Sequence, residues 1–303
     1  MARRSTWSLI LGSLLIGGLT AELPLSAQTG PIAYSVRSDG TDGQDDYLYS
    51  IDLATGIATP IGPTGFEDVE GLAFNRDCTT LYGVDDTTDR LLTCDTATGA
   101  CTQVGNLGVD ITDTGLAFLG ERLFMSTDAP KNPSRFYQLD PLLGTAALIG
   151  PQPQEVTGLA AGPAGVFGLG GDGRDNLVEI DPVTGAATVI GPLGTVQPSD
   201  GGLDFDANGV LWGIEDRGLR NPSRIFRANT ATGAATLGPT VHLANGTNLI
   251  GFEGLAIDEG VCAVLGNQPA LVEVPTLGEW GLIALAALLS LAGIASLRRK
   301  RTV

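Results

Sequence analysis

Carboxylates just ahead of repeated Gly-Leu-Ala segments are the side chains of this sequence best suited to chemistry. Glu70 lies in Val-Glu-Gly-Leu-Ala and Glu253 in Phe-Glu-Gly-Leu-Ala, so the two acids occupy the same place in two repeats. Turn-like segments elsewhere are also rich in acids, and the strongest candidates among them are Asp39, Asp85 and Asp86. Carboxylates that converge raise one another's pKa unless a cation lies among them. Calcium suits such a set, because it prefers oxygen ligands and tolerates irregular geometry.

The candidate calcium ligands are therefore Asp39, Glu70, Asp85, Asp86 and Glu253. The spacing of these acids matches no EF-hand loop, and Asp and Gly are common in turns of any kind. A solvated turn surface is therefore the alternative interpretation. The two interpretations differ in geometry, because calcium ligation requires the acids to lie within about 5 Å of a common point.

Other catalytic sets are missing from the sequence. His242 is the only histidine, there is no Gly-x-Ser-x-Gly motif, and there is no Cys-x-x-Cys pair. This composition argues against a serine hydrolase and against a zinc site.

The acids must be positioned by a repeat that fills most of the chain. Gly-Leu-Ala-Phe or a variant starts at five glycines, which lie 43 to 52 residues apart: Gly71, Gly115, Gly158, Gly202 and Gly254. A second theme, apolar-x-x-Asp-x-x-Thr-Gly-x-Ala-Thr, recurs around five turn glycines: Gly56, Gly99, Gly144, Gly185 and Gly233. A third short apolar segment lies between the two themes, as in Leu-Tyr-Gly-Val at residues 81–84.

Each period therefore holds four short strands, which is typical of one blade of a β-propeller. The first repeat starts with a second-strand segment at residues 32–36 and lacks its own first strand. The last Gly-Leu-Ala segment, at residues 254–257, can supply that strand and close the ring. The sequence thus predicts an all-β protein with a five-bladed propeller. Strand-like pieces within residues 261–274 leave a sixth blade as the alternative.

Four cysteines can form disulfides if the protein is exported. Cys94 and Cys101 flank one predicted hairpin, so they can face each other across its two strands. Cys78 and Cys262 each follow a Gly-Leu-Ala segment by a few residues, and they would then pair with each other or stay free.

Both ends of the chain have the features of targeting segments. Arg3 and Arg4 precede an apolar stretch, and Leu-Ser-Ala suits cleavage of a signal peptide after Ala27. Near the C-terminus, the uncharged residues 281–297 are long enough for a transmembrane helix, and a basic tail follows them. We expect three parts: a signal peptide at 1–27, a propeller domain at 28–274, and a C-terminal signal at 275–303.

The chain is strongly acidic, with a formal net charge of −17. Six of its 17 Lys and Arg residues lie in the two terminal segments, so the predicted domain is more acidic still. Such a charge makes nucleic acid and anionic membrane surfaces poor partners. Cations, basic proteins and neutral glycans are compatible with it.

The C-terminal segment resembles the IPTL-CTERM family of bacterial sorting signals. The resemblance rests on a motif, an apolar stretch and a basic tail in that order, and the motif residues are Val274, Pro275, Thr276, Leu277, Glu279, Trp280 and Gly281. Val274 replaces the usual isoleucine. The resemblance implies export through the inner membrane, transient membrane anchoring by the C-terminus, and recognition by an exosortase-type transpeptidase. The final location would be the cell surface or the extracellular space.

The repeats resemble those of secreted bacterial propellers, a likeness that implies fold and not activity. The preferred hypothesis is a cell-surface or extracellular-matrix protein whose propeller binds an unknown ligand, a glycan or a protein. The first alternative is a calcium-dependent propeller hydrolase, phytase-like or lactonase-like, in which the acids hold metal and activate water. A passive spacer or biofilm component is the second alternative.

Overall fold

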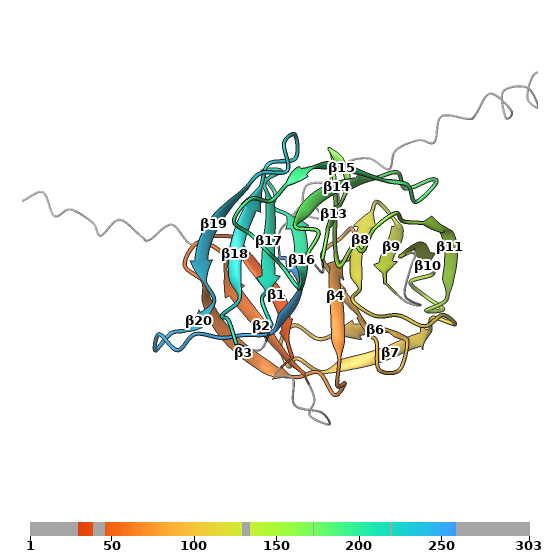
Figure 1. Ribbon diagram of the computed structural model, residues 1–303. Coiled ribbons are helices and arrows are strands. Elements are labelled where there is room, and N and C mark those ends of the chain that lie inside the picture. Colours follow the sequence, from red (N-terminus) through yellow and green to blue (C-terminus); the bar gives the residue numbers. More distant parts are fainter. Residues whose placement is uncertain (1–29, 39–45, 129–133, 172, 219, 259–303) are drawn as a thin grey trace, which may run out of the picture.

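The structure is a computed structural model that describes residues 30–38, 46–128, 134–171, 173–218 and 220–258. These residues form strands joined by turns and loops, and the strands assemble into five sheets, each built on four antiparallel strands. The sheets follow one another around a common centre, as the blades of a propeller (Figure 1). The prediction of an all-β, five-bladed propeller is confirmed. Residues 261–274, which left a sixth blade as the alternative, lie outside the described residues.

From the axis outward, the strands of each blade are arranged in the following order. Blade one contains β21 (Phe252–Ile257), β1 (Ile32–Arg37), β2 (Tyr47–Asp52) and β3 (Ile57–Pro63). Blade two contains β4 (Val69–Phe74), β5 (Leu81–Asp85), β6 (Arg90–Cys94) and β7 (Cys101–Asn106). Blade three contains β8 (Gly115–Leu119), β9 (Arg122–Thr127), β10 (Arg135–Leu139) and β11 (Ala146–Pro151). Blade four contains β12 (Gly158–Gly162), β13 (Gly165–Leu169), β14 (Asn176–Ile180) and β15 (Ala187–Pro192). Blade five contains β16 (Asp200–Phe205), β17 (Leu211–Asp216), β18 (Arg224–Ala228) and β19 (Ala235–Thr240).

Blade one joins the two ends of the described chain, as the repeat pattern predicts. β21 pairs antiparallel with β1, with Ala33 opposite Ile257. The hydroxyl of Ser35 in β1 donates a hydrogen bond to the carbonyl oxygen of Gly254 at 2.7 Å. One contact was not predicted: the two-residue strand β20 (His242–Leu243) pairs in parallel with β3 and adds a fifth strand to blade one.

Apolar side chains fill the spaces between neighbouring blades. Tyr34 of β1 meets Phe74 of β4 with ring centroids 5.6 Å apart, and Phe167 of β13 meets Phe205 of β16 at 5.7 Å. Both pairs have edge-to-face geometry and cross a blade boundary. Full burial of one such ring stabilises a fold by roughly 1.5–3 kcal/mol, so these contacts hold the blades together.

Five glycines bring the innermost strands into backbone contact around the axis. A Cβ atom on Gly115 would lie 2.6 Å from the backbone nitrogen of Leu159 in the next blade, and one on Gly202 would lie 2.2 Å from that of Leu255. The other three members of this glycine ring face the next innermost strand in the same way, at 2.8 or 2.9 Å: Gly71, Gly158 and Gly254. The contacts run from each blade to the next and return to the first. A residue with a side chain cannot take these positions without moving a blade.

Cys94 and Cys101 form the predicted disulfide across the hairpin of β6 and β7. The two residues are directly paired in the strand register, which explains why this bridge can form. Cys78 lies in the turn between β4 and β5. Its predicted partner, Cys262, lies outside the described residues, so this second bridge stays a prediction.

Replacing Gly202 with alanine is expected to lower the free energy of unfolding by about 1–3 kcal/mol or more, because the new methyl group would overlap the backbone of β21. Urea unfolding of both proteins measures the difference. Gly238→Ala is the comparison variant: this glycine is also in a strand, and its Cβ would lie 3.1 Å from the carbonyl oxygen of Ile225, a tight contact but a much smaller overlap than the 2.2 Å at Gly202. Equal stability of the two variants would contradict the steric argument.

Candidate functional site

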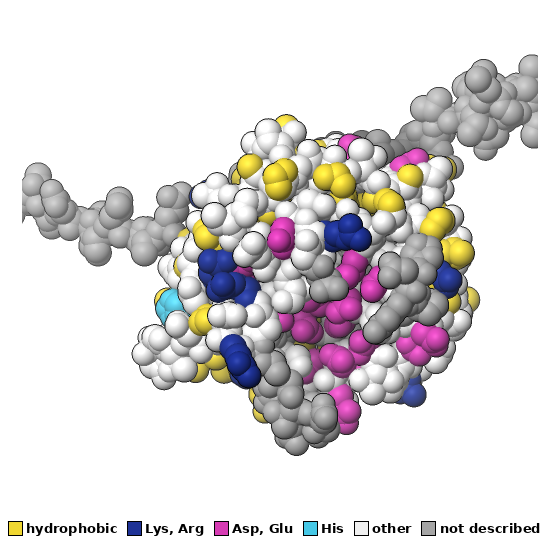
Figure 2. Space-filling view, viewed as in Figure 1, with side chains coloured by type: hydrophobic (Ala, Val, Ile, Leu, Met, Phe, Trp, Pro, Cys, Tyr) yellow, Lys and Arg dark blue, Asp and Glu magenta, His cyan; other side chains and the backbone are white. Residues whose placement is uncertain are grey.

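The innermost strands of all five blades begin at the same end of the ring, and acids lie at or just ahead of each beginning. They precede the ring glycines by one to three residues: Asp68 and Glu70 at β4, Asp113 at β8, Glu155 at β12, Asp200 at β16 and Glu253 at β21. Figure 2 shows acidic side chains gathered in the middle of one face, with arginine side chains around them. We name one set the acidic mouth: Asp68, Glu70, Asp113, Asp200 and Glu253.

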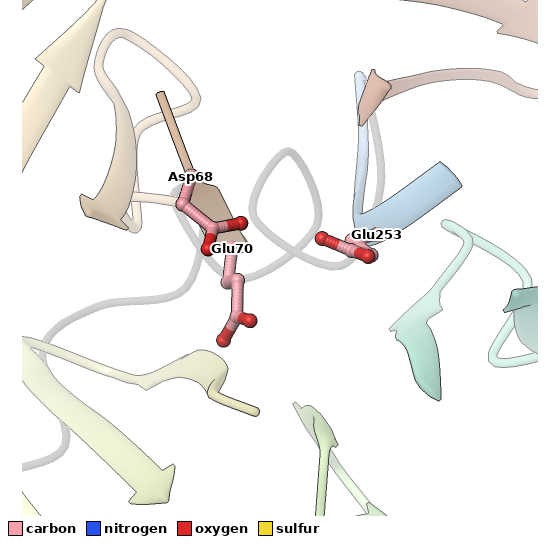
Figure 3. Close-up of side chains that lie close together, drawn as sticks. All are labelled: Asp68, Glu70 and Glu253. Carbon is pink, nitrogen blue, oxygen red and sulfur yellow. The ribbon is translucent and has the colours of Figure 1, made fainter. Parts of the chain in front are cut away.

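Two groups of three carboxylates form within the acidic mouth. The first consists of Asp68, Glu70 and Glu253, and the second consists of Glu70, Asp113 and Asp200. In each group, one oxygen atom per residue lies within 4.8 Å of the others. Figure 3 shows Glu253 facing Asp68 and Glu70 from the opposite side. Oxygens around one Ca²⁺ lie up to about 5 Å apart, because each bond is about 2.3–2.6 Å long. Both groups are therefore narrow enough to hold a metal ion.

A third group extends outward from the acidic mouth. It consists of Asp113, Asp128 and Glu155, whose oxygens also lie within 4.8 Å of one another, and all three side chains are partly exposed. The hydroxyl of Ser134 donates a hydrogen bond to Asp128 Oδ1 at 2.7 Å. Greater exposure and this existing partner make the third group a weaker candidate for a metal than the first two.

Burial and mutual repulsion raise the pKa of the acids in the mouth. Burial is the largest cause for Glu70, whose pKa is raised well above its usual value, and the charges of Asp200 and Glu253 add to the shift. The pKa values of Asp200 and Glu253 are also raised well above normal, by burial first and then by neighbouring acids. At the edge of the mouth, burial and the neighbouring Asp68 raise the pKa of Asp86 to about 8. The ionised mouth is therefore electrostatically strained without a counter-ion.

Few hydrogen-bond donors compensate these charges. Glu70 Oε2 accepts a hydrogen bond from the backbone N–H of Thr114 at 2.5 Å, and Asp200 Oδ1 accepts one from the next backbone N–H. Glu253 Oε2 is buried and accepts none, and the same holds for Oδ1 of Asp216, which is paired with Asp200 across the sheet. Among the residues that the structure describes, no ion pair involves Glu70, Asp200 or Glu253.

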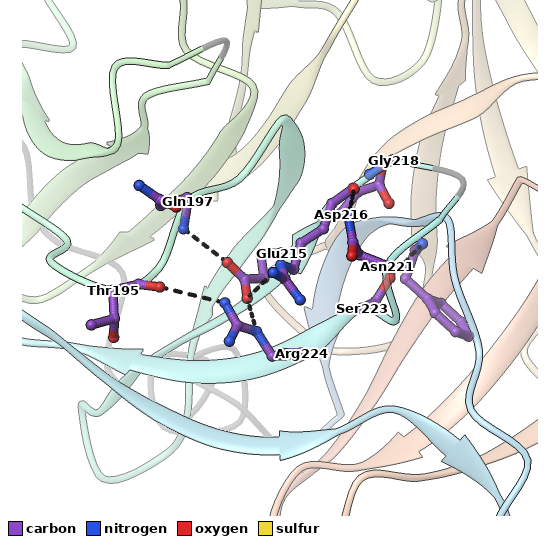
Figure 4. Close-up of polar contacts among 10 residues, drawn as sticks. Thr195, Gln197, Glu215, Asp216, Gly218, Asn221, Ser223 and Arg224 are labelled. Atoms are coloured by element: carbon purple, nitrogen blue, oxygen red, sulfur yellow. Dashed lines mark hydrogen bonds and ion pairs between the residues drawn. The ribbon is translucent and has the colours of Figure 1, made fainter.

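Glu215 of β17 is a buried acid of the same fold whose charge is compensated. Its side chain has no exposed surface, and it pairs with Arg224 and with Arg217, whose Nε lies 3.7 Å away. The backbone N–H of Gln197 also donates to Glu215 Oε2 at 3.0 Å (Figure 4). Among the described residues, no arginine forms an ion pair with Glu70, Asp200 or Glu253. A metal ion is the natural counter-charge there.

The structure brings some of the predicted ligands together. Glu70 and Glu253 share a group of the acidic mouth, and Asp86 lies beside Asp68 at its edge. Asp39 lies outside the described residues.

Asp85 belongs to none of the three groups, although it is buried and its Oδ1 accepts no hydrogen bond. Its Oδ2 accepts hydrogen bonds from both the backbone N–H and the hydroxyl of Thr88. This carboxylate therefore stabilises its own turn. Metal binding by any of these acids stays a prediction.

Sequence analysis missed Asp113, Glu155 and Asp200. They precede the ring glycines by two or three residues, whereas Glu70 and Glu253 precede them by one. The signal that could have revealed them is an acid within three positions ahead of every Gly-Leu segment. A comparison of only the residue next to each glycine does not show this pattern of acids.

Comparison with known proteins finds a family match at the C-terminus. The model of the IPTL-CTERM motif matches residues 274–299, which confirms the predicted sorting signal. A signal of this kind implies export, processing by an exosortase-type enzyme at the membrane, and a surface destination. The described ranges contain no helix long and apolar enough to cross a membrane. The predicted signal peptide and transmembrane helix lie outside those ranges.

Two solved structures with similar chains are "Crystal structure of Nidogen/Laminin Complex" and "Crystal structure of TolB from Acinetobacter baumannii". The first has 13% sequence identity and a TM-score of 0.47, and the match covers 70% of this chain and 77% of that chain. The second has 14% identity and a TM-score of 0.45, and the match covers 76% of this chain and 66% of that chain. No curated protein matches. Similarities at these values identify no function for this chain.

Without divalent cations, the free energy of unfolding is expected to fall as pH rises from about 5 to 8. The folded protein holds Glu70, Asp200 and Glu253 at raised pKa values, so it binds more protons than the unfolded chain above the unfolded pKa of about 4. Stability is therefore greatest in acid and is lost as these groups ionise. Thermal unfolding in EDTA across this range measures the trend.

General repulsion in an acidic protein would give a slope of the same sign, so a control is needed. Glu70→Gln is expected to flatten the pH dependence, whereas Glu121→Gln, whose side chain is 79% exposed, should leave it unchanged. A wild-type midpoint that is level or rises with pH would contradict the repulsion in the mouth.

Proposed function

We propose that this protein is an exported surface protein whose propeller is a calcium-dependent binding module. The acidic mouth would hold the ion, and the face around it would bind an extracellular glycan or protein. One observation carries the proposal: carboxylates from four of the five blades converge in two groups, each with at least one buried member, and the described residues offer no ion pair to Glu70, Asp200 or Glu253.

Calcium fits these groups better than other common ions. Every candidate ligand is an oxygen, which suits hard cations and disfavours zinc or copper. The ligands come from four blades, with Asp68 and Glu70 both at blade two, and have no regular octahedral arrangement imposed by one loop. Calcium accepts six to eight oxygens in flexible geometry, whereas magnesium demands a near-ideal octahedron.

The position of the one histidine argues against a hydrolase that would use histidine at the acidic mouth, whereas a metal-activated water would need none. His242 lies in β20 at the outer edge of blade one, and its Nδ1 is 2.8 Å from the carbonyl oxygen of Leu243. His242 is therefore at the outer edge of a blade, whereas the acids of the mouth lie at the start of the innermost strands, near the axis. Histidine-assisted proton transfer at the mouth is thus unsupported.

The terminal segments would determine where the module acts. In this proposal, residues 1–27 direct export and are removed, and residues 28–274 remain as the binding domain. Residues 275–303 anchor the protein transiently through an apolar helix until an exosortase-type enzyme processes the motif. The matched sorting signal at 274–299 supports this order of events.

Calcium is expected to raise the unfolding temperature of the EDTA-treated protein. An ion that binds only the folded state stabilises it by about 2.7 kcal/mol at a hundredfold excess over its dissociation constant. Thermal unfolding with EDTA and then with millimolar calcium measures the effect at neutral pH. The double variant Glu70→Gln and Glu253→Gln should lose the response, and Glu121→Gln should keep it. An unchanged wild-type midpoint would reject the proposal and leave the acids as a solvated surface.

Removing residues 275–303 is expected to release the protein into the medium of an expressing strain that contains an exosortase-type enzyme. The full chain should instead be retained with the cells or the matrix, because it carries the sorting signal. Immunoblots of cell and medium fractions measure the distribution. Changing Pro275 and Thr276 to alanine in the full chain tests the motif without removing the apolar stretch. Identical fractionation of all three proteins would contradict sorting by this segment.

A further inference from the structure

The two carboxylate groups of the acidic mouth share one residue, Glu70. The first group adds Asp68 and Glu253 to it, and the second adds Asp113 and Asp200. The five acids therefore fall into two overlapping sets of three. They do not form one set in which all ligand oxygens lie within 4.8 Å of one another.

Glu70 is held in place between the two sets. It lies in β4 next to Gly71 of the glycine ring, and its side chain is only 5% exposed. Its Oε2 accepts the hydrogen bond from Thr114, which lies beside Asp113. The backbone of the neighbouring blade thus fixes the carboxylate, while a carboxylate has about four lone-pair sites and can serve two ions at once.

Charge permits a second divalent ion when the acids are ionised. One dication would then balance two of the five carboxylates, and two dications would balance four.

Two buried oxygens point to a ligand independently of the clustering. Oε2 of Glu253, a residue of the first set, has no hydrogen-bond partner. Oδ1 of Asp216 is also without a partner; this residue is 8% exposed, belongs to neither set, and its charge acts on both Asp200 and Glu253. One orphaned oxygen is therefore on a member of the first set, and the other is beside members of both sets. Buried polar atoms are normally satisfied, so each requires a partner.

We propose that the acidic mouth holds two divalent cations of the calcium type, bridged by the carboxylate of Glu70. Asp68 and Glu253 complete the ligands of one ion, and Asp113 and Asp200 complete those of the other. This inference rests on the proposed calcium-dependent function and specifies its stoichiometry. Asp128 and Glu155 belong to the one group without a buried member, and in this proposal they hold no tightly bound ion.

The test counts tightly bound calcium per chain. Purified full-length protein is stripped with EDTA, exchanged into metal-free buffer and titrated with calcium alone in a calorimeter, and equilibrium dialysis with metal analysis gives an independent count. Two ions per chain are expected for the wild type. Glu253→Gln and Asp200→Asn should each leave one ion, because each removes a ligand from one set only. Glu70→Gln should weaken both sites, by roughly a hundredfold.

Control variants and distinct outcomes separate the two proposals. Asp128→Asn and Glu121→Gln should both retain two ions. One ion in the wild type would overturn the bridged pair and keep the calcium-dependent function, whereas none would overturn both. Two ions that are both lost from Asp200→Asn with its fold intact would overturn the assignment of separate ligand sets. If Glu70→Gln does not fold, the wild type and the other two variants still decide the count.

Discussion

Backbone contact between glycines at the axis is the constraint on which the rest of this structure depends. Each ring glycine lies where a Cβ atom would be 2.2–2.9 Å from the innermost strand of the next blade. The five innermost strands can approach this closely only because no side chain separates them. Side chains just ahead of the glycines are therefore brought together as well, and in this chain several of them are acids. The same contact that closes the ring thus crowds the carboxylates.

This crowding explains why the fold accommodates two kinds of buried acid. Glu215 is distant enough from the axis for two arginines to reach it, so its charge is compensated within the protein. Glu70 and Glu253 lie next to ring glycines, where the surrounding surface consists of other innermost strands and their acids. A small ion bonded to oxygens at about 2.3–2.6 Å suits carboxylate oxygens that lie within 4.8 Å of one another.

The sequence predicted the architecture well because the repeat carries it directly. Five Gly-Leu segments and five Thr-Gly turns define the number of strands and blades, and the missing first strand of blade one predicted the pairing of β21 with β1. The strand β20 was missed because a two-residue pairing leaves no periodicity in the sequence. Glu70 and Glu253 could be recognised by their identical position. Asp113 and Asp200 could not, because a shift of one residue along a strand normally turns a side chain to the other face. The strands β4 and β21 have a register shift beside Glu70 and Glu253, which the sequence does not show, whereas β16 pairs regularly from Asp200.

The direction of β21 has a consequence for how the domain would stand on a cell. This strand begins with Phe252 and Glu253 at the acidic mouth and runs through the ring to Ile257 at the opposite face. The described chain ends one residue later, and β1 begins on that same opposite side, where Ala33 pairs with Ile257. A tether attached beyond Asp258 would therefore pull on the face away from the mouth. The domain would sit with its carboxylates turned outward, toward whatever approaches the cell.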